Sequence, residues 1–157
     1  ETVEQIVAEV TAVDDEINVG VSGSRGAHVA ANRKHFERAV TNLVLNAMAY
    51  GRPDIRVEIR EIGDHVVVDV QDSGPGIPEA DRPKVVKPFV RLSKQKNRGT
   101  GLGLAIVSRI MNLHGGRLHI LDAPQGGASI QLVWKRHSSD SGGGLLKRLW
   151  SSSIVSW

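Results

Sequence analysis

Two glycine-rich stretches decide the fold of this chain, DSGPGI at residues 72–77 and GTGLGLAIV at residues 99–107. A helix-like segment before them carries Asn42 and Asn46, and a basic segment that includes Phe89 separates them. The chain therefore reads, in order, as an asparagine-bearing helix, an aspartate–glycine turn, a basic loop and a glycine-opened helix. This order predicts a pocket for a magnesium nucleotide. The sequence contains neither a Walker loop nor a Rossmann turn, so the pocket would be built differently from those two kinds of nucleotide site.

The composition is that of an ordinary globular domain. The chain has 157 residues, of which 40% are hydrophobic and 24% are charged, so we expect one domain with a sizeable core. The absence of cysteine excludes disulfides and thiolate metal sites. A net charge of +3 is too small to indicate a nucleic-acid partner. The sequence begins with Glu, its N-terminus does not resemble a signal peptide, and we expect a fragment of a longer protein.

Hydrophobic periodicity predicts helices and strands in a mixed order. Apolar spacings of three and four indicate helices at 2–15, 33–50 and 102–113. Alternation indicates strands at 16–22, 27–31, 54–62, 65–71, 117–122 and 127–135. A short helix is expected at 79–86 and a loop at 87–101. This order predicts an α/β fold in which helices cover one face of a mixed or antiparallel sheet. The other face is polar, with Arg56, Glu58, Arg60, Asp69 and Gln71.

The composition changes near the C-terminus. Residues 1–136 are expected to form the domain, and residues 137–157 a flexible linker and tail. Leu145, Leu149 and Trp150 have a near-helical spacing that would suit a partner or a membrane surface. A disordered tail, or one added to the natural protein, is the interpretation we favour.

Asn42 and Asn46 lie four residues apart and therefore project from one face of the predicted 33–50 helix. Their amide oxygens suit a hard cation such as Mg²⁺, which prefers oxygen ligands and keeps several waters. Surface asparagines without a binding role are the alternative, and this alternative is the better one for the pair taken alone.

Asp72 follows a predicted strand and precedes Gly74 and Gly76. A carboxylate at this place can accept a hydrogen bond from an exocyclic amine such as that of adenine, and glycines permit a ligand to approach closely. An ordinary turn at the end of a strand is the simpler interpretation when this motif is taken in isolation.

The glycines at 99, 101 and 103 open a predicted helix, and free N–H groups at a helix start bind phosphate well. The segment before them is basic, with Arg82, Lys84, Lys87, Arg91, Lys94, Lys96 and Arg98. A solvated loop and a phosphate-facing lid are two interpretations of these charges. The flanking glycine motifs favour the lid.

Together the motifs resemble the catalytic, ATP-binding domain of sensor histidine kinases, in the GHKL or Bergerat superfamily shared with gyrase and MutL ATPases. NLVLNAMAYG at 42–51 is similar to the N box, DSGPGI at 72–77 to the G1 box, PFVRL at 88–92 to the F box, and GTGLGLAIV at 99–107 to the G2 box. The resemblance is strongest to osmosensor-type kinases with a short lid. It implies a two-layer α/β sandwich, with a mixed sheet, helices on one face and a mobile ATP lid.

The resemblance also implies a role for each matching residue in binding ATP and Mg²⁺. Asn46 would be the principal magnesium ligand, with Asn42 assisting near the phosphates, and Asp72 would bind the adenine amine. Other expected contacts are the adenine floor at Gly74 and Gly76, the apolar walls Ile77, Leu102 and Leu104, the ribose-side Tyr50, the lid anchor Phe89, the phosphate-facing Arg91, Lys94 and Arg98, and the phosphate cap of Gly99, Thr100, Gly101 and Gly103.

Two features depart from the family pattern. Ala49 stands where many relatives have a basic residue, so one phosphate contact is missing or is supplied by the lid or by Arg38. No histidine of the chain is followed by an acidic residue, as the family's phosphoacceptor is; the histidines are His28, His35, His65, His114, His119 and His137. We therefore expect the phosphoacceptor histidine on a separate dimerisation domain.

The function implied by the resemblance is that of a protein histidine kinase, whose catalytic domain transfers the γ-phosphoryl of ATP to that histidine. Expected partners are the dimerisation domain and a response regulator, without nucleic acid, in a membrane-bound homodimer whose kinase part lies in the cytoplasm at the inner membrane. Asn42 stands where hydrolytic relatives have a water-activating glutamate, which opposes rapid hydrolysis. A nucleotide-gated ATPase and a nucleotide-responsive interaction module without kinase activity are the alternatives.

Overall fold

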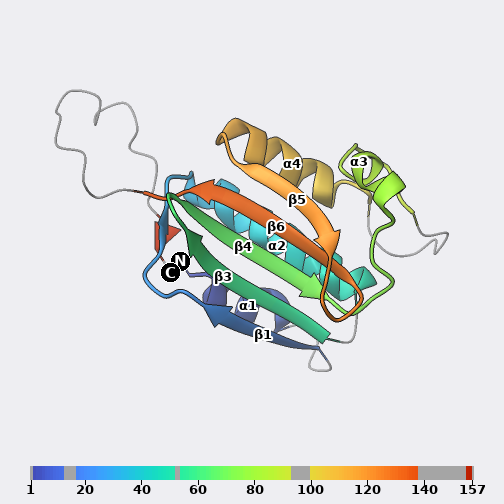
Figure 1. Ribbon diagram of the computed structural model, residues 1–157, viewed down its shortest axis with the longest axis horizontal. Coiled ribbons are helices and arrows are strands. Elements are labelled where there is room, and N and C mark those ends of the chain that lie inside the picture. Colours follow the sequence, from blue (N-terminus) through green and yellow to red (C-terminus); the bar gives the residue numbers. More distant parts are fainter. Residues whose placement is uncertain (1, 13–16, 52–53, 93–99, 138–154, 157) are drawn as a thin grey trace.

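A five-stranded mixed sheet forms one layer of the protein, and helices cover one of its faces (Figure 1). The computed structural model describes residues 2–12, 17–51, 54–92, 100–137 and 155–156. The expected two-layer α/β architecture, with helices on one side of a mixed sheet, is confirmed.

The strand order in the sheet is β1-β3-β4-β6-β5. These strands are β1 (Asn18–Gly23), β3 (Asp54–Ile62), β4 (His65–Asp72), β5 (Arg117–Asp122) and β6 (Ala128–Lys135). β1 runs parallel to β3, whereas the β3–β4, β4–β6 and β5–β6 pairs are antiparallel. Val68 of the central strand β4 lies between Ile59 of β3 and Leu132 of β6. This register turns the alternate apolar residues of three strands toward the helices.

Three helices form the second layer, and their ends are set by local chemistry. In α1 (Val3–Thr11) the Thr2 side chain and Gln5 form a capping box. In α2 (Arg33–Tyr50) the Asn32 side chain accepts a hydrogen bond from the His35 N–H, and the helix ends at Gly51. The third helix, α4 (Gly103–Leu113), has no side-chain cap at its N-terminus.

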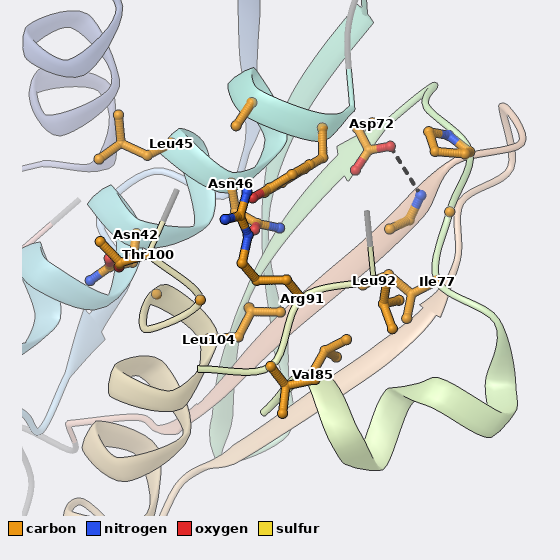
Figure 2. Close-up of a pocket in the computed structure, with 18 residues that line it drawn as sticks. Asn42, Leu45, Asn46, Asp72, Ile77, Val85, Arg91, Leu92, Thr100 and Leu104 are labelled. Carbon is orange, nitrogen blue, oxygen red and sulfur yellow. Dashed lines mark hydrogen bonds between the residues drawn. The ribbon is translucent and has the colours of Figure 1, made fainter. Parts of the chain in front are cut away.

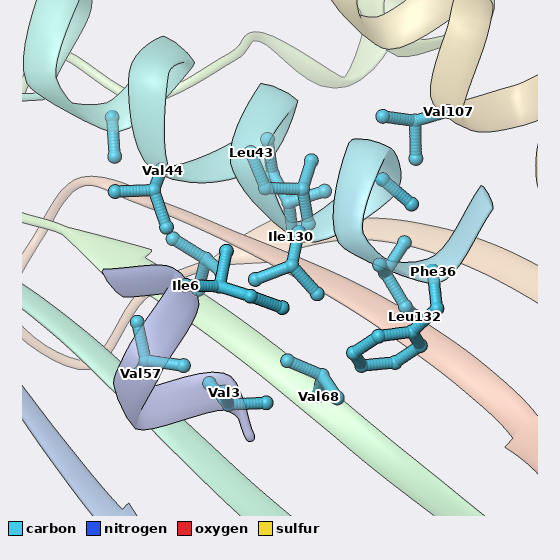
Figure 3. Close-up of a cluster of buried hydrophobic side chains, with 14 of the residues drawn as sticks. Val3, Ile6, Phe36, Leu43, Val44, Val57, Val68, Val107, Ile130 and Leu132 are labelled. Atoms are coloured by element: carbon cyan, nitrogen blue, oxygen red, sulfur yellow. The ribbon is translucent and has the colours of Figure 1, made fainter. Parts of the chain in front are cut away.

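The core lies between the two layers (Figure 3). Phe36, Leu43 and Val44 of α2 are fully or almost fully buried, and they face Val68 and Leu132 of the sheet. Ile6 of α1 and Val107 of α4 enclose the same cluster from the two sides, which fixes all three helices relative to the strands.

Asp69 forms a buried polar cluster on the opposite face of the sheet. The Asp69 side chain is almost fully buried, and its Oδ1 accepts from Ser129 Oγ at 2.7 Å. Its Oδ2 accepts from Arg60 Nη2 at 3.0 Å, from Gln71 Nε2 at 3.0 Å and from Gln131 Nε2 at 2.9 Å. The donors come from β3, β4 and β6, so one carboxylate links three strands. The polar character expected for this face is confirmed.

Some expected elements differ from those observed. The expected strand at 27–31 is reduced to β2 (His28–Val29), which is outside the large sheet and pairs with β7 (Val155–Ser156). The expected helix at 79–86 is divided into a 3₁₀ turn, η1 (Glu79–Asp81), and α3 (Arg82–Val85), because Pro83 cannot donate an N–H within a continuous helix.

The expected linker and tail at 137–157 fall almost entirely outside the described residues. Within that range, His137 donates its N–H to the carbonyl of His28, and Val155–Ser156 form β7. The residues with near-helical spacing, 145–150, are outside the described ranges.

A pair of histidines joins the start of α2 to the end of α4. His35 Nδ1 lies 3.0 Å from His114 Nε2, and the two rings meet edge to face. The His114 ring also lies close to that of Trp134, with centroids 5.7 Å apart. Burial lowers the pKa of His114 below its usual value, and the neighbouring His35 lowers this pKa further.

The lowered pKa of His114 makes the stability depend on pH. Below about pH 6.5 the unfolded chain binds more protons at this position than the folded protein does, so the free energy of unfolding decreases as the pH falls. We expect His114→Gln to lose less stability between pH 7.5 and pH 5.5 than the unchanged protein, as measured by urea unfolding. Asn112→Gln on the exposed end of α4 removes no titratable group and is the matched control, so it should leave the pH slope unchanged. Equal slopes for all three proteins would contradict the prediction.

Candidate functional site

A cavity of about 390 Å³ opens between α2, the start of α4 and the segment that follows β4 (Figure 2). It is lined by Asn42, Leu45, Asn46, Ala49, Tyr50, Asp72, Pro75, Gly76, Ile77, Val85, Val90, Arg91, Leu92, Thr100, Gly101, Gly103, Leu104 and Ala128. Its size lies within the range of small-molecule sites, and a largely apolar lining with a few polar groups is typical of them.

One face of α2 forms a side of this cavity. Asn42 and Asn46 lie on it with Ala49, at intervals of four and three residues, whereas Leu43 and Ala47 are buried against the sheet. The same helix therefore supplies core contacts and cavity contacts from adjoining faces. The expectation that the asparagines share one face is confirmed.

The carboxamide of Asn42 has a defined orientation. Its Nδ2 donates to the carbonyl of Arg38 at 2.8 Å, so its Oδ1 remains available as an acceptor. This oxygen lies close to Gly103, where an added Cβ would be 3.5 Å away from it. The amide oxygen and the uncapped first turn of α4 are thus neighbours at the cavity edge.

Asp72 at the end of β4 is held by two backbone amides. Its side chain is 6% exposed, and its Oδ1 accepts from the Gly74 N–H at 2.9 Å and from the Ala128 N–H at 3.2 Å. Among the described residues, no group donates to its Oδ2. The carboxylate therefore has a fixed orientation and a remaining acceptor in a cavity wall, which suits a hydrogen-bond donor of a ligand.

Glycines surround Asp72 because there is no room for side chains. A Cβ at Gly51 would lie 2.6 Å from Asp72 Oδ2, and a Cβ at Gly127 would overlap the Asp72 carbonyl. A Cβ at Gly74 would lie 2.6 Å from the carbonyl oxygen of Tyr50. Gly74 therefore permits the turn to pack on the end of α2 and does not line the cavity, unlike Gly76.

Gly51 and Gly127 had no expected place in the site. The sequence predicted Gly51 only as the residue that ends a helix. Gly127 lies 55 positions beyond Asp72 in the sequence. Both act through contacts between distant parts of the chain, which spacing alone does not reveal.

The segment after β4 forms the outer wall. Ile77, Val85, Val90 and Leu92 contribute apolar surface to the cavity, and the side chain of Arg91 extends toward Asn46 (Figure 2). Except for Ile77, these apolar residues were not expected in the site. They lie in a short helix and a loop, where no periodicity indicates which side chains face inward.

Phe89 differs from its expected role as the lid anchor. Its side chain is 75% exposed and does not line the cavity, and its backbone has a φ of 65°. The anchoring contact is made by the backbone, since the Phe89 N–H donates to the carbonyl of Gly101 at 3.0 Å. The positive φ turns the phenyl ring away from the domain.

The glycine-opened helix is only partly described. Thr100, Gly101, Gly103 and Leu104 line the cavity as expected, whereas Leu102, expected in the apolar wall, does not. The remaining expected phosphate contacts Lys94, Arg98 and Gly99 lie outside the described residues.

The sequence matches one protein family over most of the described chain. Residues 31–138 match the family described as histidine kinase-, DNA gyrase B- and HSP90-like ATPase. The chain belongs to this family. Membership of this ATPase family implies that the domain binds ATP, the nucleotide expected from the sequence.

Relatives of this histidine kinase-like ATPase domain include proteins named as a nitrogen regulation protein and as a sensor histidine kinase. Nitrogen regulation protein NtrY of Azorhizobium caulinodans is 38% identical over 114 residues, which cover 66% of this chain and 14% of NtrY. Sensor histidine kinase CpxA of Escherichia coli K12 is 36% identical over 106 residues, which cover 66% of this chain and 23% of CpxA. The chain thus spans less than a quarter of the length of these relatives.

Solved structures of sensor kinases have the same fold. The mycobacterial sensor histidine kinase MprB superposes with a TM-score of 0.77 at 30% identity, covering 85% of this chain and 93% of that one. The histidine kinase domain of the E. coli osmosensor EnvZ superposes with a TM-score of 0.60 at 33% identity, covering 89% of each chain. The resemblance to the catalytic domain of sensor histidine kinases is confirmed. None of the helices in the described ranges is long and apolar enough to span a bilayer.

The packing of Gly51 against Asp72 can be tested in this ATPase domain. We expect Gly51→Ala to lower the free energy of unfolding by about 1–3 kcal/mol, because the new methyl group must displace the Asp72 carboxylate or the end of α2. Urea unfolding measures the loss, and NMR shifts of the Gly74 and Ala128 amides report the displacement. Gly20→Ala in β1 is the matched control, since an added Cβ there meets nothing within 4 Å. Equal stability of both variants would contradict the steric role of Gly51.

Proposed function

We propose that this domain binds ATP with Mg²⁺ in the described cavity and donates the γ-phosphoryl group to a histidine of a separate dimerisation domain. The supporting observation is that one cavity combines an oriented carboxylate, two asparagine amides and an uncapped helix start. These features occur in a chain whose relatives are named sensor histidine kinases.

The base of the nucleotide would lie against Asp72. The unused Oδ2 of this carboxylate suits the exocyclic amine of adenine, directly or through a water molecule. Gly76 leaves room for the ring, and Ile77 and Leu104 supply apolar contacts on its faces. A guanine in the same orientation would present a carbonyl oxygen to the carboxylate, so the site favours adenine.

The triphosphate would extend along α2 toward the start of α4. The first amides of α4 have no side-chain cap and would donate to phosphate oxygens. Asn46 would bind Mg²⁺ through its amide oxygen, and the oriented Oδ1 of Asn42 fits a second or water-mediated contact. Mg²⁺ neutralises charge on the phosphates when bound. Arg91 would take over the charge contact that Ala49 cannot make.

The polar lining favours transfer over hydrolysis. Asp72 is the sole carboxylate among the described residues that line the cavity, and its Oδ1 is already occupied by two amides at the base end. No lining residue described near Asn42 can take a proton from water at neutral pH. An incoming imidazole needs no such base, because its neutral nitrogen attacks phosphorus directly while the bond to the bridging oxygen breaks and ADP leaves.

The attacking histidine would come from another domain. None of the six histidines lines the cavity; His35 lies near the start of α2 and His114 at the end of α4, away from the cavity. The chain covers only a small part of its sensor-kinase relatives, so the parent protein has room for a dimerisation domain and a sensor part. A response regulator would then receive the phosphoryl group, and the parent would be a membrane-bound homodimer with this domain in the cytoplasm.

Removal of the proposed magnesium ligand should weaken nucleotide binding selectively. We expect Asn46→Ala to lower the affinity for a non-hydrolysable ATP analogue about tenfold with Mg²⁺ present and less than threefold with EDTA, because the lost amide contacts the metal. Isothermal titration calorimetry measures both affinities. Asn112→Ala, on the exposed end of α4, is the matched control. Equal losses with and without Mg²⁺ would remove Asn46 from its role as a metal ligand.

The chemical outcome separates the kinase from the alternatives. The domain is mixed with the histidine-bearing helical hairpin of its parent protein and ATP labelled at the γ-phosphoryl group. We expect an acid-labile label on the hairpin histidine and slow release of free phosphate. Free phosphate alone would indicate a nucleotide-gated ATPase. Nucleotide binding with neither product would indicate an interaction module, an outcome that the missing basic residue at Ala49 makes worth testing.

A further inference from the structure

Arg82 does not line the cavity itself, but its side chain connects two parts of the protein next to it. Its side chain is 20% exposed. Its Nε donates to the carbonyl of Ile77 at 3.0 Å, and its Nη2 donates to Asp122 Oδ1 at 2.6 Å. Ile77 belongs to the cavity wall, and Asp122 is the last residue of β5. One guanidinium group therefore holds the wall to the end of the sheet.

The hydrogen bond from Arg82 to the Ile77 carbonyl adds a polar connection to the packing of the partly buried Ile77 side chain against the core. Within the described part of the chain, the backbone of residues 75–77 is held by one hydrogen bond, from Arg82 Nε to the carbonyl of Ile77. Gly76 has a φ of 71°, and an added Cβ there would approach the Gly127 carbonyl to 3.4 Å. The segment thus lies over the hairpin between β5 and β6, and Arg82 adds hydrogen bonds that connect it to the end of β5.

The same hairpin holds Asp72. The Ala128 N–H, at the start of β6, donates to Asp72 Oδ1, and Asp122 pairs directly with Ala128 in the sheet. Asp72 and Ile77 are therefore both positioned from one pair of residues, Ala128 through its amide and Asp122 through Arg82. The separation between the carboxylate and the apolar wall follows from these two connections.

We propose that Arg82 is a positioning residue that sets the width of the slot between Asp72 and Ile77 in which the base of the nucleotide binds. This inference rests on the proposed function. Arginine suits the role because its planar guanidinium group makes two hydrogen bonds in a fixed geometry, whereas the ammonium group of lysine cannot reproduce that pair.

If Arg82 has this role, its replacement should lower nucleotide affinity much more than it lowers the free energy of unfolding. Asp122 is 81% exposed, and exposed ion pairs contribute little to folding. Loss of Arg82 should therefore leave the free energy of unfolding nearly unchanged while the wall at Ile77 becomes mobile. We expect the contacts to the base of the nucleotide to weaken, and the contacts to its phosphates, at the other end of the cavity, to stay unchanged.

The test compares two ligands of the same domain, MgATP and magnesium tripolyphosphate, in Arg82→Gln, Arg82→Lys and Asp122→Asn. Competition against a fluorescent ATP analogue gives both affinities. We expect Arg82→Gln to bind MgATP about three to ten times more weakly, with tripolyphosphate affinity changed less than twofold. Arg82→Lys should recover little, and Asp122→Asn should show a smaller loss. Arg109→Gln, on the exposed side of α4, is the matched control.

A second measurement does not depend on ligand. Amide hydrogen exchange of residues 77–85 should be faster in Arg82→Gln than in the unchanged protein, with the exchange of β4 unaffected. Equal losses of affinity for both ligands, or unchanged MgATP affinity and unchanged exchange, would overturn the role of Arg82 and leave the proposed function intact. An unchanged protein that bound no MgATP would instead overturn the proposed function, and this inference with it.

Discussion

The carboxylate of Asp72, held by the amides of Gly74 and Ala128, is the contact on which the rest of the site depends. A buried charge is costly unless hydrogen bonds replace its lost hydration, and here two backbone donors do so at one oxygen only. The turn after β4 and the hairpin before β6 both close around this group. The position of the cavity follows, since its base end is the place where the second carboxylate oxygen remains available.

The antiparallel pair of α2 and α4 gives the domain two chemically different ends. At one end, asparagine amides meet an uncapped helix start, which together suit a metal and a phosphate chain. At the other end, His35 meets His114, and the His114 ring lies close to that of Trp134. Between them, Leu43 and Val107 bury the helices against the sheet, so the polar groups at the cavity are carried on rigid elements.

The sequence predicted this site best where one element carries the information. Asn42 and Asn46 share a helical face and Asp72 ends a strand, as periodicity predicts, whereas their expected roles came from the resemblance to the family. Gly51 and Gly127 were not predicted as parts of the site, and Arg82 was expected only as one charge of a phosphate-facing lid. Their contacts with Asp72 and Asp122 join segments at least 20 positions apart, which spacing in the sequence does not reveal. The exposure of the Phe89 ring and its positive backbone φ are likewise features that no residue type reveals in advance.

The Asp69 cluster on the open face has a consequence for the cavity on the other. A slip of β4 by one position against its neighbours would carry this carboxylate into the hydrocarbon interior, away from Ser129, Gln131 and Arg60. Such mispairing is strongly disfavoured, so Asp69 fixes the register of the central strand β4 against its neighbours. Asp72 lies three positions further along that strand, and its meeting with Ala128 is thereby secured from the far side of the sheet.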